Sequence, residues 1–412
     1  MKERVVITGI GTINPLGNTL KTSWNACKNG QNGIDFIKQI DTEDIAVKLA
    51  GEIKDFDLLE YFGKKQLRRM DRFTQLALIA SDEAILDAKL DLDLINKTKV
   101  GVYFSSGIGG LATIANENEK ALEKGYHRIS PFFIPMAIIN IAAGQIAIKY
   151  GFKGPATASV TACASAANSI GDAFRAIKDG YLDIAVTGGS EASITKLGLS
   201  GFHVMQALSD SNDPNCASIP FDKNRSGFVM GEGGGTLILE SLSHATQRNA
   251  KIYAEIVGYG ATCDAAHITS PDPEGEGARQ CMENALKEGN VSLNDVGYIN
   301  AHGTSTPLND KIETLAIKRL FKEHASKLSV SSTKSMTGHL LGASGAIEAI
   351  FSIMALKDQW VPPTINHQTF DPECDLDYTV NHGKSKTFDY ALTNSLGFGG
   401  HNATLVFKRW SE

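Results

Sequence analysis

The segment Val160–Ala167 has the sequence VTACASAA, in which a β-branched pair precedes one cysteine among small residues. Valine and threonine favour extended backbone, whereas the alanines that follow favour a helix. The segment therefore predicts a sharp strand-to-helix junction, with Cys163 at the start of a helix that continues to Lys178. Unpaired N–H groups at a helix N-terminus stabilise a thiolate and lower the thiol pKa. Cys163 is therefore a candidate nucleophile, although a buried structural cysteine is the commoner outcome.

Short β-branched runs alternate with amphipathic helical stretches along the whole chain. Strands are expected over 5–8, 100–105, 183–187, 252–257, 296–300, 328–331 and 403–408, and helices over 73–88, 164–178, 277–289 and 345–357. Such alternation is typical of α/β layers. The same order of elements recurs after residue 250, so the sequence predicts two similar halves, 1–250 and 251–412. A single doubly wound sheet with insertions is the alternative architecture.

The 412-residue chain is 42% hydrophobic and 21% charged, which excludes a disordered chain, a collagen-like fibre and a coiled coil. Its net charge of −6 differs from that of a globally basic nucleic-acid binder. No apolar run reaches the roughly 20 residues of a membrane span, and the N-terminal residues lack a signal-peptide pattern. The six cysteines are scattered, with no C-x-x-C pair that would indicate a zinc site. We therefore expect a cytoplasmic protein with no nucleic-acid partner, membrane insertion, metal or cofactor.

Two further segments place a histidine in a loop where a predicted strand ends. His302 lies in Tyr298–Pro307 (YINAHGTSTP), and His339 lies in Ser331–Gly342 (SSTKSMTGHLLG). Loops at strand ends are where α/β proteins gather catalytic groups. Together with the thiol of Cys163, the two imidazoles form a plausible Cys/His/His set. A metal site is the rival interpretation, but neither histidine has a third ligand at a suitable spacing.

A glycine-rich segment near the C-terminus, Asn394–Asn402 (NSLGFGGHN), surrounds Phe398 with three glycines. Glycines allow unusual backbone angles, so neighbouring N–H groups can converge on an anion and the loop can move. The segment therefore predicts part of an oxyanion hole, with a tight hairpin as the alternative. A phosphate loop is excluded because no G-x-x-x-x-G-K-[ST] motif is present, and Gly9–Asn14 lacks the third glycine of a dinucleotide fingerprint.

In this order and at these separations, the four segments resemble those of the β-ketoacyl-acyl-carrier-protein synthases of the thiolase superfamily, most closely the chain-elongating type II enzymes. The likeness covers essentially the whole chain. Further matching segments are Met70–Thr74 (MDRFT), Ser106–Gly110 (SGIGG), Pro220–Arg225 (PFDKNR) and Gly227–Gly233 (GFVMGEG). The resemblance implies a thiolase-like five-layer αβαβα fold built from two similar halves, and a homodimer. It also implies a decarboxylative Claisen condensation of malonyl carrier protein with an acyl primer, which gives 3-oxoacyl carrier protein and CO2.

The resemblance implies a role for each matching position. Cys163 carries the acyl group as a thioester, and the backbone N–H groups of Cys163 and Phe398 bind the acyl oxyanion. His302 and His339 assist decarboxylation and hold the enolate oxygen. The other implied site residues are a supporting charged pair and two hydroxyls for the pantetheine arm: Lys334 with Glu348, and Thr304 with Thr306.

An acyl tunnel and a docking surface are also implied by the resemblance. The tunnel is expected to be lined by Ile108 and Phe202, with Phe133 and Ile134 contributed across the dimer interface. The acidic acyl carrier protein is expected to dock on Lys65, Arg68 and Arg69, within the basic stretch from Lys64 to Arg72. A solvated helix face is the alternative for that stretch.

Two positions depart from the pattern of the family. Gln206 stands where a basic residue is common, which puts one docking contact in doubt, and Ala265–His267 lacks an aromatic residue before the histidine. A type I elongating synthase shares all the motifs and stays an alternative. A noncatalytic chain-length-factor-like subunit would lack Cys163, and a cysteine hydrolase finds no protease-like Cys-His-Asn/Asp set here.

Overall fold

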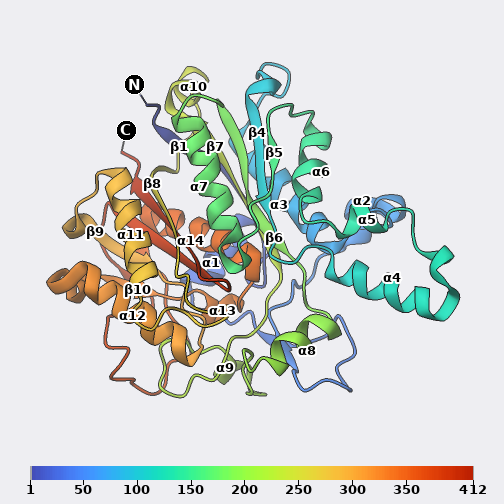
Figure 1. Ribbon diagram of the computed structural model, residues 1–412. Helices are drawn as coiled ribbons and strands as arrows, with labels where there is room; N and C mark the ends of the chain where they lie inside the picture. The colour runs from blue at the N-terminus through green and yellow to red at the C-terminus, as the bar shows by residue number, and fades with distance from the viewer. Residues whose placement is uncertain (1, 412) are drawn as a thin grey trace.

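The computed structural model describes residues 2–411, and within that range ten strands form one mixed sheet. The first half of the chain supplies β1 (Val5–Ile13), β4 (Val100–Ser105), β5 (Ala156–Thr157), β6 (Ile184–Glu191) and β7 (Gly233–Ser241). The second half supplies β8 (Ala254–Cys263), β9 (Val296–Asn300), β10 (Ser329–Ser331), β13 (Tyr390–Gly397) and β14 (His401–Arg409). The order across the sheet is β10-β9-β13-β14-β8-β1-β7-β6-β4-β5 (Figure 1).

The two sets of five strands have the same order and the same directions. β1 pairs antiparallel with β7 and β7 antiparallel with β6, while β6, β4 and β5 run parallel. β8, β14, β13, β9 and β10 repeat that arrangement strand for strand. The sets join where Val5–Ile7 pairs antiparallel with Ala254–Ile256. One topology is therefore used twice, as expected for a fold of two similar halves.

Helices divide the molecule into five layers. On the outer faces, α3 (Arg72–Ala88) packs on β1 and β7, and α11 (Glu276–Gly289) packs on β8 and β14. In the middle, α7 (Ser165–Lys178) packs against α14 (Ser344–Asp358), and both contact strands of the sheet. Every residue of α14 from Ser344 to Leu356 is buried, because this mainly apolar helix is covered on all sides. The start of α14 thus forms part of the molecule's interior.

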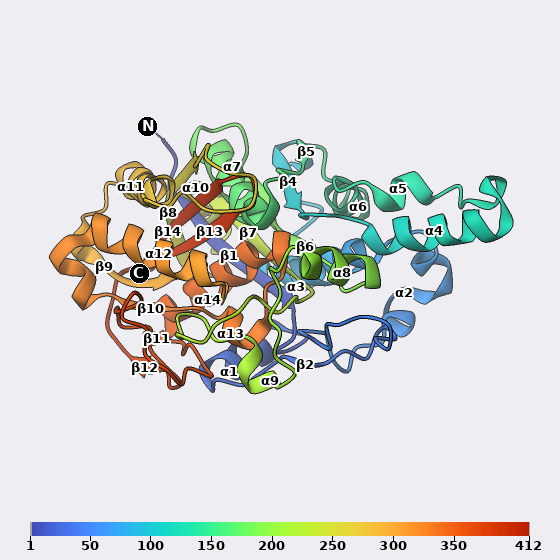
Figure 2. The ribbon, with the colours of Figure 1, turned by 60° about the horizontal axis from the view of Figure 1, so that its bottom comes forward.

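The remaining elements surround this core. They are α1 (Leu20–Lys28), α2 (Leu58–Leu67), α4 (Leu111–Lys124), α5 (Phe133–Ala137), α6 (Ile141–Tyr150), α8 (Lys196–Val204), α9 (Pro214–Ala217), α10 (Leu242–Gln247), α12 (Pro307–Phe321), α13 (Lys334–Thr337), β2 (Asp35–Phe36) with β3 (Leu49–Ala50), and β11 (Trp360–Val361) with β12 (Lys384–Ser385). Figure 2 shows α4 and α5 as an arm that projects from the body. Among residues 2–411, no helix combines the length and the apolarity needed to span a bilayer.

Every predicted strand and helix has a counterpart in the structure, but many other elements, among them α4, α6 and α12, were not predicted. β4 and β9 have the predicted bounds, but β7 and β13 were not predicted. The backbone before Cys163 is not a strand: β5 ends at Thr157, and an irregular segment leads into a 3-10 turn over Ala162–Ala164. The nucleophile candidate therefore follows a loop, and α7 begins two residues after it.

Candidate active site

A cavity of about 1250 Å³ is lined by residues from both halves of the chain. It brings together half of the site residues predicted from the sequence, namely Cys163, Phe202, His302, Thr304, Thr306, His339 and Phe398. Among the described residues, no three His, Cys, Asp or Glu side chains converge in a way that could hold a metal ion. The reactive groups in the cavity include the thiol of Cys163 and the imidazoles of His302 and His339.

The thiol of Cys163 is held on a strained turn beside an imidazole. Ala162 has φ of 50°, a left-handed conformation that L-residues rarely adopt and that often marks functional sites. The Cys163 Sγ lies 3.1 Å from Nε2 of His339. The backbone N–H of Phe398 acts to lower the pKa of this thiol. Groups from the second half of the chain thus surround a candidate nucleophile from the first half.

The ionisation of Cys163 differs from the prediction. Burial raises the pKa of the thiol to about 12, although the Lys334 ammonium and the Phe398 N–H act to lower it. The expected lowering of the thiol pKa by the helix N-terminus is therefore wrong, because the loss of hydration outweighs the favourable dipole. Donors that contact the sulfur consequently decide how readily the thiolate forms.

His302 is neutral and is oriented by a lysine behind it. Burial, followed by the charge of Lys334 and the neighbouring His339, holds the pKa of His302 well below its usual range. The Nζ of Lys334 donates to the carbonyl oxygen of His302 at 2.6 Å and lies 3.4 Å from its Nδ1. Because an ammonium can only donate, Nδ1 is the acceptor and Nε2 carries the proton. Lys334 also pairs with Glu348, as expected.

His339 is likewise neutral, since burial and the charge of Lys334 hold its pKa well below the usual histidine range. Its ring lies edge-on to the ring of His302, with 5.3 Å between centroids, and edge-on to Phe228 at 5.1 Å. Its Nδ1 contacts the hydroxyl of Ser344 at 2.8 Å. The two imidazoles therefore have fixed orientations beside the sulfur.

Buried carboxylates that were not predicted from the sequence fix the loops around these groups. Glu313 on α12 accepts hydrogen bonds from the backbone N–H groups of His302 and Gly303, each at 2.8 Å, and from the amide of Asn394. Burial raises the pKa of Glu313, although those donors act to lower it. The sequence signal was its position eleven residues after the histidine, on a helix that follows the histidine loop.

Glu191 performs the same task on the other side of the cavity. It accepts from the backbone N–H groups of Gly107 and Gly342 at 2.8 and 3.1 Å. The Ser106 and Ser193 hydroxyls also donate to it. The loop that precedes α4 is thereby tied to the loop that carries His339.

The glycine loop places Phe398 across the cavity. Gly399 and Gly400 adopt φ of 85° and 75°, which are accessible to glycine and costly for other residues. The ring of Phe398 lies 6.3 Å from that of Phe202, measured between centroids. Thr304 and Thr306 line the same cavity, and their hydroxyl oxygens are 2.8 Å apart.

Only one of the predicted tunnel residues lines the cavity. Phe202 lines it, while Ile108 packs behind it in an apolar cluster that includes Leu199 and Leu341. Phe133 and Ile134 lie on α5, in the projecting arm, and do not line this chain's own cavity. Their predicted contribution across a dimer interface stays a prediction.

The predicted docking residues are on the surface at the end of α2. Lys65, Arg68 and Arg69 are exposed, and the guanidinium of Arg69 lies 4.9 Å from the centre of the Phe132 ring. Arg72, the last residue of the basic stretch, is not available for docking. It forms a two-bond ion pair with the buried Glu232, at 2.6 and 2.7 Å.

The two positions that depart from the family pattern lie near the cavity. Gln206 lines it and adopts φ of 56°. His267 accepts hydrogen bonds through Nδ1 from the backbone N–H groups of Thr269 and Ser270, both at 3.1 Å. The loop that carries His267 is thus ordered locally without an aromatic side chain at Ala266.

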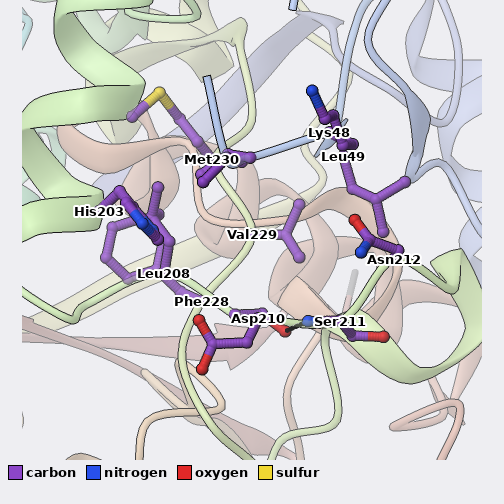
Figure 3. A pocket seen from close by; sticks show the side chains of 13 residues that line it. Lys48, Leu49, His203, Leu208, Asp210, Ser211, Asn212, Phe228, Val229 and Met230 are labelled. Carbon is purple, nitrogen blue, oxygen red and sulfur yellow. Dashed lines mark hydrogen bonds between the residues drawn. The ribbon is translucent and has the colours of Figure 1, made fainter. Parts of the chain in front are cut away.

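A smaller hollow of about 100 Å³ lies beside the main cavity and shares His203, Leu208, Asp210 and Phe228 with it (Figure 3). Lys48, His203, Asp210 and Asn212 are among its lining residues. It contains neither the thiol nor the paired imidazoles, and its volume is close to that of a few water molecules. The larger cavity is therefore the candidate active site.

Comparison with known proteins places the chain in a family. Residues 2–245 match the Beta-ketoacyl synthase, N-terminal domain, and residues 253–368 match the Beta-ketoacyl synthase, C-terminal domain. The chain is 53% identical over 408 residues to 3-oxoacyl-[acyl-carrier-protein] synthase 2 of Staphylococcus aureus, covering 99% of both chains. It is 52% identical over 410 residues to the protein of that name from Synechocystis, again covering 99% of both.

Solved structures agree with the sequence matches. A complex of a type II PKS acyl-carrier protein with its ketosynthase bound to the hexaketide superposes with a TM-score of 0.91 at 35% identity, covering 100% of both chains. A beta-ketoacyl synthase from Burkholderia phymatum gives a TM-score of 0.92 at 33% identity, covering 99% of this chain and 100% of that one. With the fold, the cavity and the two domain matches taken together, the chain belongs to the beta-ketoacyl synthase family.

Proposed function

We propose that the protein is a 3-oxoacyl-[acyl-carrier-protein] synthase of the type II class, which extends acyl chains in fatty-acid synthesis. The observation that carries this proposal is the contact between Cys163 Sγ and His339 Nε2, at 3.1 Å, with neutral His302 in the same cavity. An intact thiol with two neutral imidazoles fits condensation, and it does not fit a noncatalytic chain-length factor.

The first half-reaction is acyl transfer to Cys163. The sulfur attacks the thioester carbonyl of the primer, and the carbonyl oxygen becomes an oxyanion. The backbone N–H of Phe398 acts on the thiol and, with the N–H of Cys163, binds that oxyanion. Collapse of the intermediate breaks the bond to the pantetheine sulfur, which leaves with the proton from the thiol.

The second half-reaction forms the carbon–carbon bond. The C–C bond to the malonyl carboxylate breaks, CO2 leaves, and the electron pair enters an enolate. His302 and His339 donate through Nε2 to the developing oxygen charge, and burial keeps both rings neutral. The enolate carbon then attacks the acyl group on Cys163, and the C–S bond breaks. Thr304 and Thr306 hold the pantetheine arm.

The carrier protein and a second copy of the chain are the partners in this proposal. An acidic carrier protein fits the exposed cations Lys65, Arg68 and Arg69. A homodimer is supported by the edge strand β5, whose outer side is unpaired within the described residues, and by exposed apolar side chains on the neighbouring elements. These side chains include Ile134, Ile138, Ile148 and Val160.

An assay of the purified protein with malonyl carrier protein and acyl carrier proteins of graded length tests the proposed function. Formation of 3-oxoacyl carrier protein with release of CO2 is the expected result. Hydrolysis of the acyl thioester without a condensation product would indicate a hydrolase. Comparison of saturated with cis-unsaturated primers decides between the type II assignment and a type I-like enzyme.

Charge reversal on the docking surface should weaken binding of the carrier protein. In an Arg68→Glu/Arg69→Glu variant we expect KM for acyl carrier protein to rise about tenfold at low salt, because like charges then meet at encounter. The rate with small thioester mimics should not change. The control is Lys21→Glu/Lys89→Glu, which changes the net charge equally at exposed lysines of a separate hollow. An unchanged KM would place docking elsewhere.

Enlarging Ile108 should shorten the acyl chains that the enzyme accepts. Ile108 packs with Phe202 and Leu199 behind the cavity, so an Ile108→Phe side chain would overfill the tunnel. We expect the rate with fourteen-carbon primers to fall at least about tenfold more than the rate with six-carbon primers. Ile108→Leu conserves volume and should retain the preference of the parent. Equal losses for both primers would show that the tunnel runs along another path.

A further inference from the structure

The two catalytic imidazoles meet different groups at their inner nitrogens. Nδ1 of His302 faces the ammonium of Lys334, which can only donate. Nδ1 of His339 faces the hydroxyl of Ser344 at 2.8 Å, and a hydroxyl can either donate or accept. The proton position on His302 is therefore fixed by charge. The proton position on His339 depends on which way the hydroxyl of Ser344 points.

The surroundings of Ser344 decide that direction. Ser344 is the first residue of α14 and is 2% exposed. In the described part of the chain, His339 Nδ1 is the one hydrogen-bond partner found for its Oγ. If the hydroxyl accepted from Nδ1, its own proton would be buried without an acceptor. An unsatisfied buried O–H donor costs more free energy than an oxygen lone pair of Ser344 that accepts no hydrogen bond. The Ser344 hydroxyl is therefore expected to donate its proton to Nδ1 of His339.

This direction matters because His339 carries a single ring proton. Burial and the charge of Lys334 keep the ring neutral. With Nδ1 acting as the acceptor, the proton sits on Nε2, which faces Cys163 Sγ at 3.1 Å. An N–H aimed at the sulfur stabilises the thiolate and can later donate to the enolate oxygen. In the opposite tautomer, Nε2 would accept from the thiol and stabilise its neutral form.

We infer that Ser344 is a positioning residue that holds His339 in the Nε2–H tautomer and thereby makes the Cys163 thiolate accessible. The inference rests on the proposed function, since it concerns how His339 serves condensation. The other ionisable groups that act on Cys163 and His339 are His302, Lys334, Glu348 and Glu191. None of these groups hydrogen-bonds Nδ1 of His339 in the described structure, so Ser344 is the one partner found there for that nitrogen.

A Ser344→Ala variant tests the inference through the pH dependence of thiol reactivity. Loss of one neutral hydrogen bond should raise the pH midpoint of Cys163 alkylation by about 0.5–1 unit. Mass spectrometry of the Cys163 peptide measures the extent of alkylation at each pH. The kcat of malonyl decarboxylation should fall about three- to tenfold, while KM for the carrier substrate stays as in the parent. An unchanged midpoint together with an unchanged kcat would overturn the inference.

Two companion variants separate positioning from a loss of structure. Ser344→Thr retains the hydroxyl, so the pH midpoint of Cys163 alkylation should equal that of the parent protein. A folded Ser344→Thr variant that behaves like Ser344→Ala contradicts the inference. Ser352→Ala removes a buried hydroxyl from the same helix, where it donates only to the carbonyl oxygen of Glu348. This control should keep the parent profile. A shift as large as that of Ser344→Ala would point to a general disturbance of α14.

The tautomer can also be observed directly. In protein labelled with ring-15N histidine, the signals of His339 are identified by their loss from His339→Ala. We expect a protonated Nε2 and an unprotonated Nδ1 in the parent, and a mixture of tautomers in Ser344→Ala. A protonated Nδ1 in the parent would refute the inference even if His339 is essential. If His339→Ala retained full condensation activity, the proposed function of His339 would fail instead.

Discussion

Replacing Cys163 with alanine should abolish condensation, with a loss of at least about 10⁴-fold in the rate of 3-oxoacyl product formation. The reason is geometric as well as chemical. Cys163 is the thiol that lies 3.1 Å from His339 Nε2, and the Phe398 N–H acts to lower its pKa. No acyl-enzyme can form without it. Product formation from acyl and malonyl carrier proteins, together with mass spectrometry of the acylated enzyme, measures both steps.

A second substitution at the same position separates the two half-reactions. Cys163→Gln should also lose condensation but retain malonyl decarboxylation, because His302 and His339 stay in place beside the amide. Cys216→Ala provides the matched control, since Cys216 is another partly exposed cysteine but does not line the cavity. It should elongate at the parent rate. Full elongation by Cys163→Ala would refute the proposed mechanism at its first step.

The family and the fold were predictable from the sequence because the motifs occur in fixed order. The resemblance to the elongating synthases is confirmed by 53% identity over 408 residues, and the repeated sheet topology agrees with the expected two halves. The boundary at residues 250 and 251 stays a prediction. β7 was missed because it begins with three glycines, which normally weaken strands. In this structure, a Cβ at Gly235 would come within about 3.1 Å of Ala346 on α14, so glycine permits close packing.

The site was predictable as far as local motifs carry chemistry. Cys163, His302 and His339 each stand in a recognisable segment, and the structure brings them into one cavity. The thiol pKa, by contrast, depends on how much water the folded chain excludes, and spacing along the sequence does not report that. Glu313 and Ser344 were missed for a related reason. A buried carboxylate or hydroxyl has a role only through the partner that the fold places beside it.

Removing one of the two imidazoles that donate to the enolate oxygen should greatly slow decarboxylation. In His339→Ala, we expect malonyl decarboxylation to fall about 10²–10³-fold, which is typical of the loss of a preorganised oxyanion donor. Acyl transfer to Cys163 should fall less, because the N–H of Phe398 still serves the acyl oxyanion. Rates of CO2 release and of acyl-enzyme formation, measured separately, give the two effects. His324→Ala is the control, since that histidine bonds the carbonyl of Val296 and does not line the cavity.

The pH profile supplies an independent check on the same assignment. Decarboxylation requires both imidazoles neutral, and burial holds the pKa values of His302 and His339 well below the usual histidine range. The two rings therefore become protonated only at lower pH. Decarboxylation should persist as the pH falls through about 6.5, which is the pKa of an unperturbed histidine. A decline centred on that value would mean that a hydrated histidine controls the step. Equal losses of acyl transfer and decarboxylation in His339→Ala would likewise contradict a division of labour between the imidazoles and the backbone N–H groups.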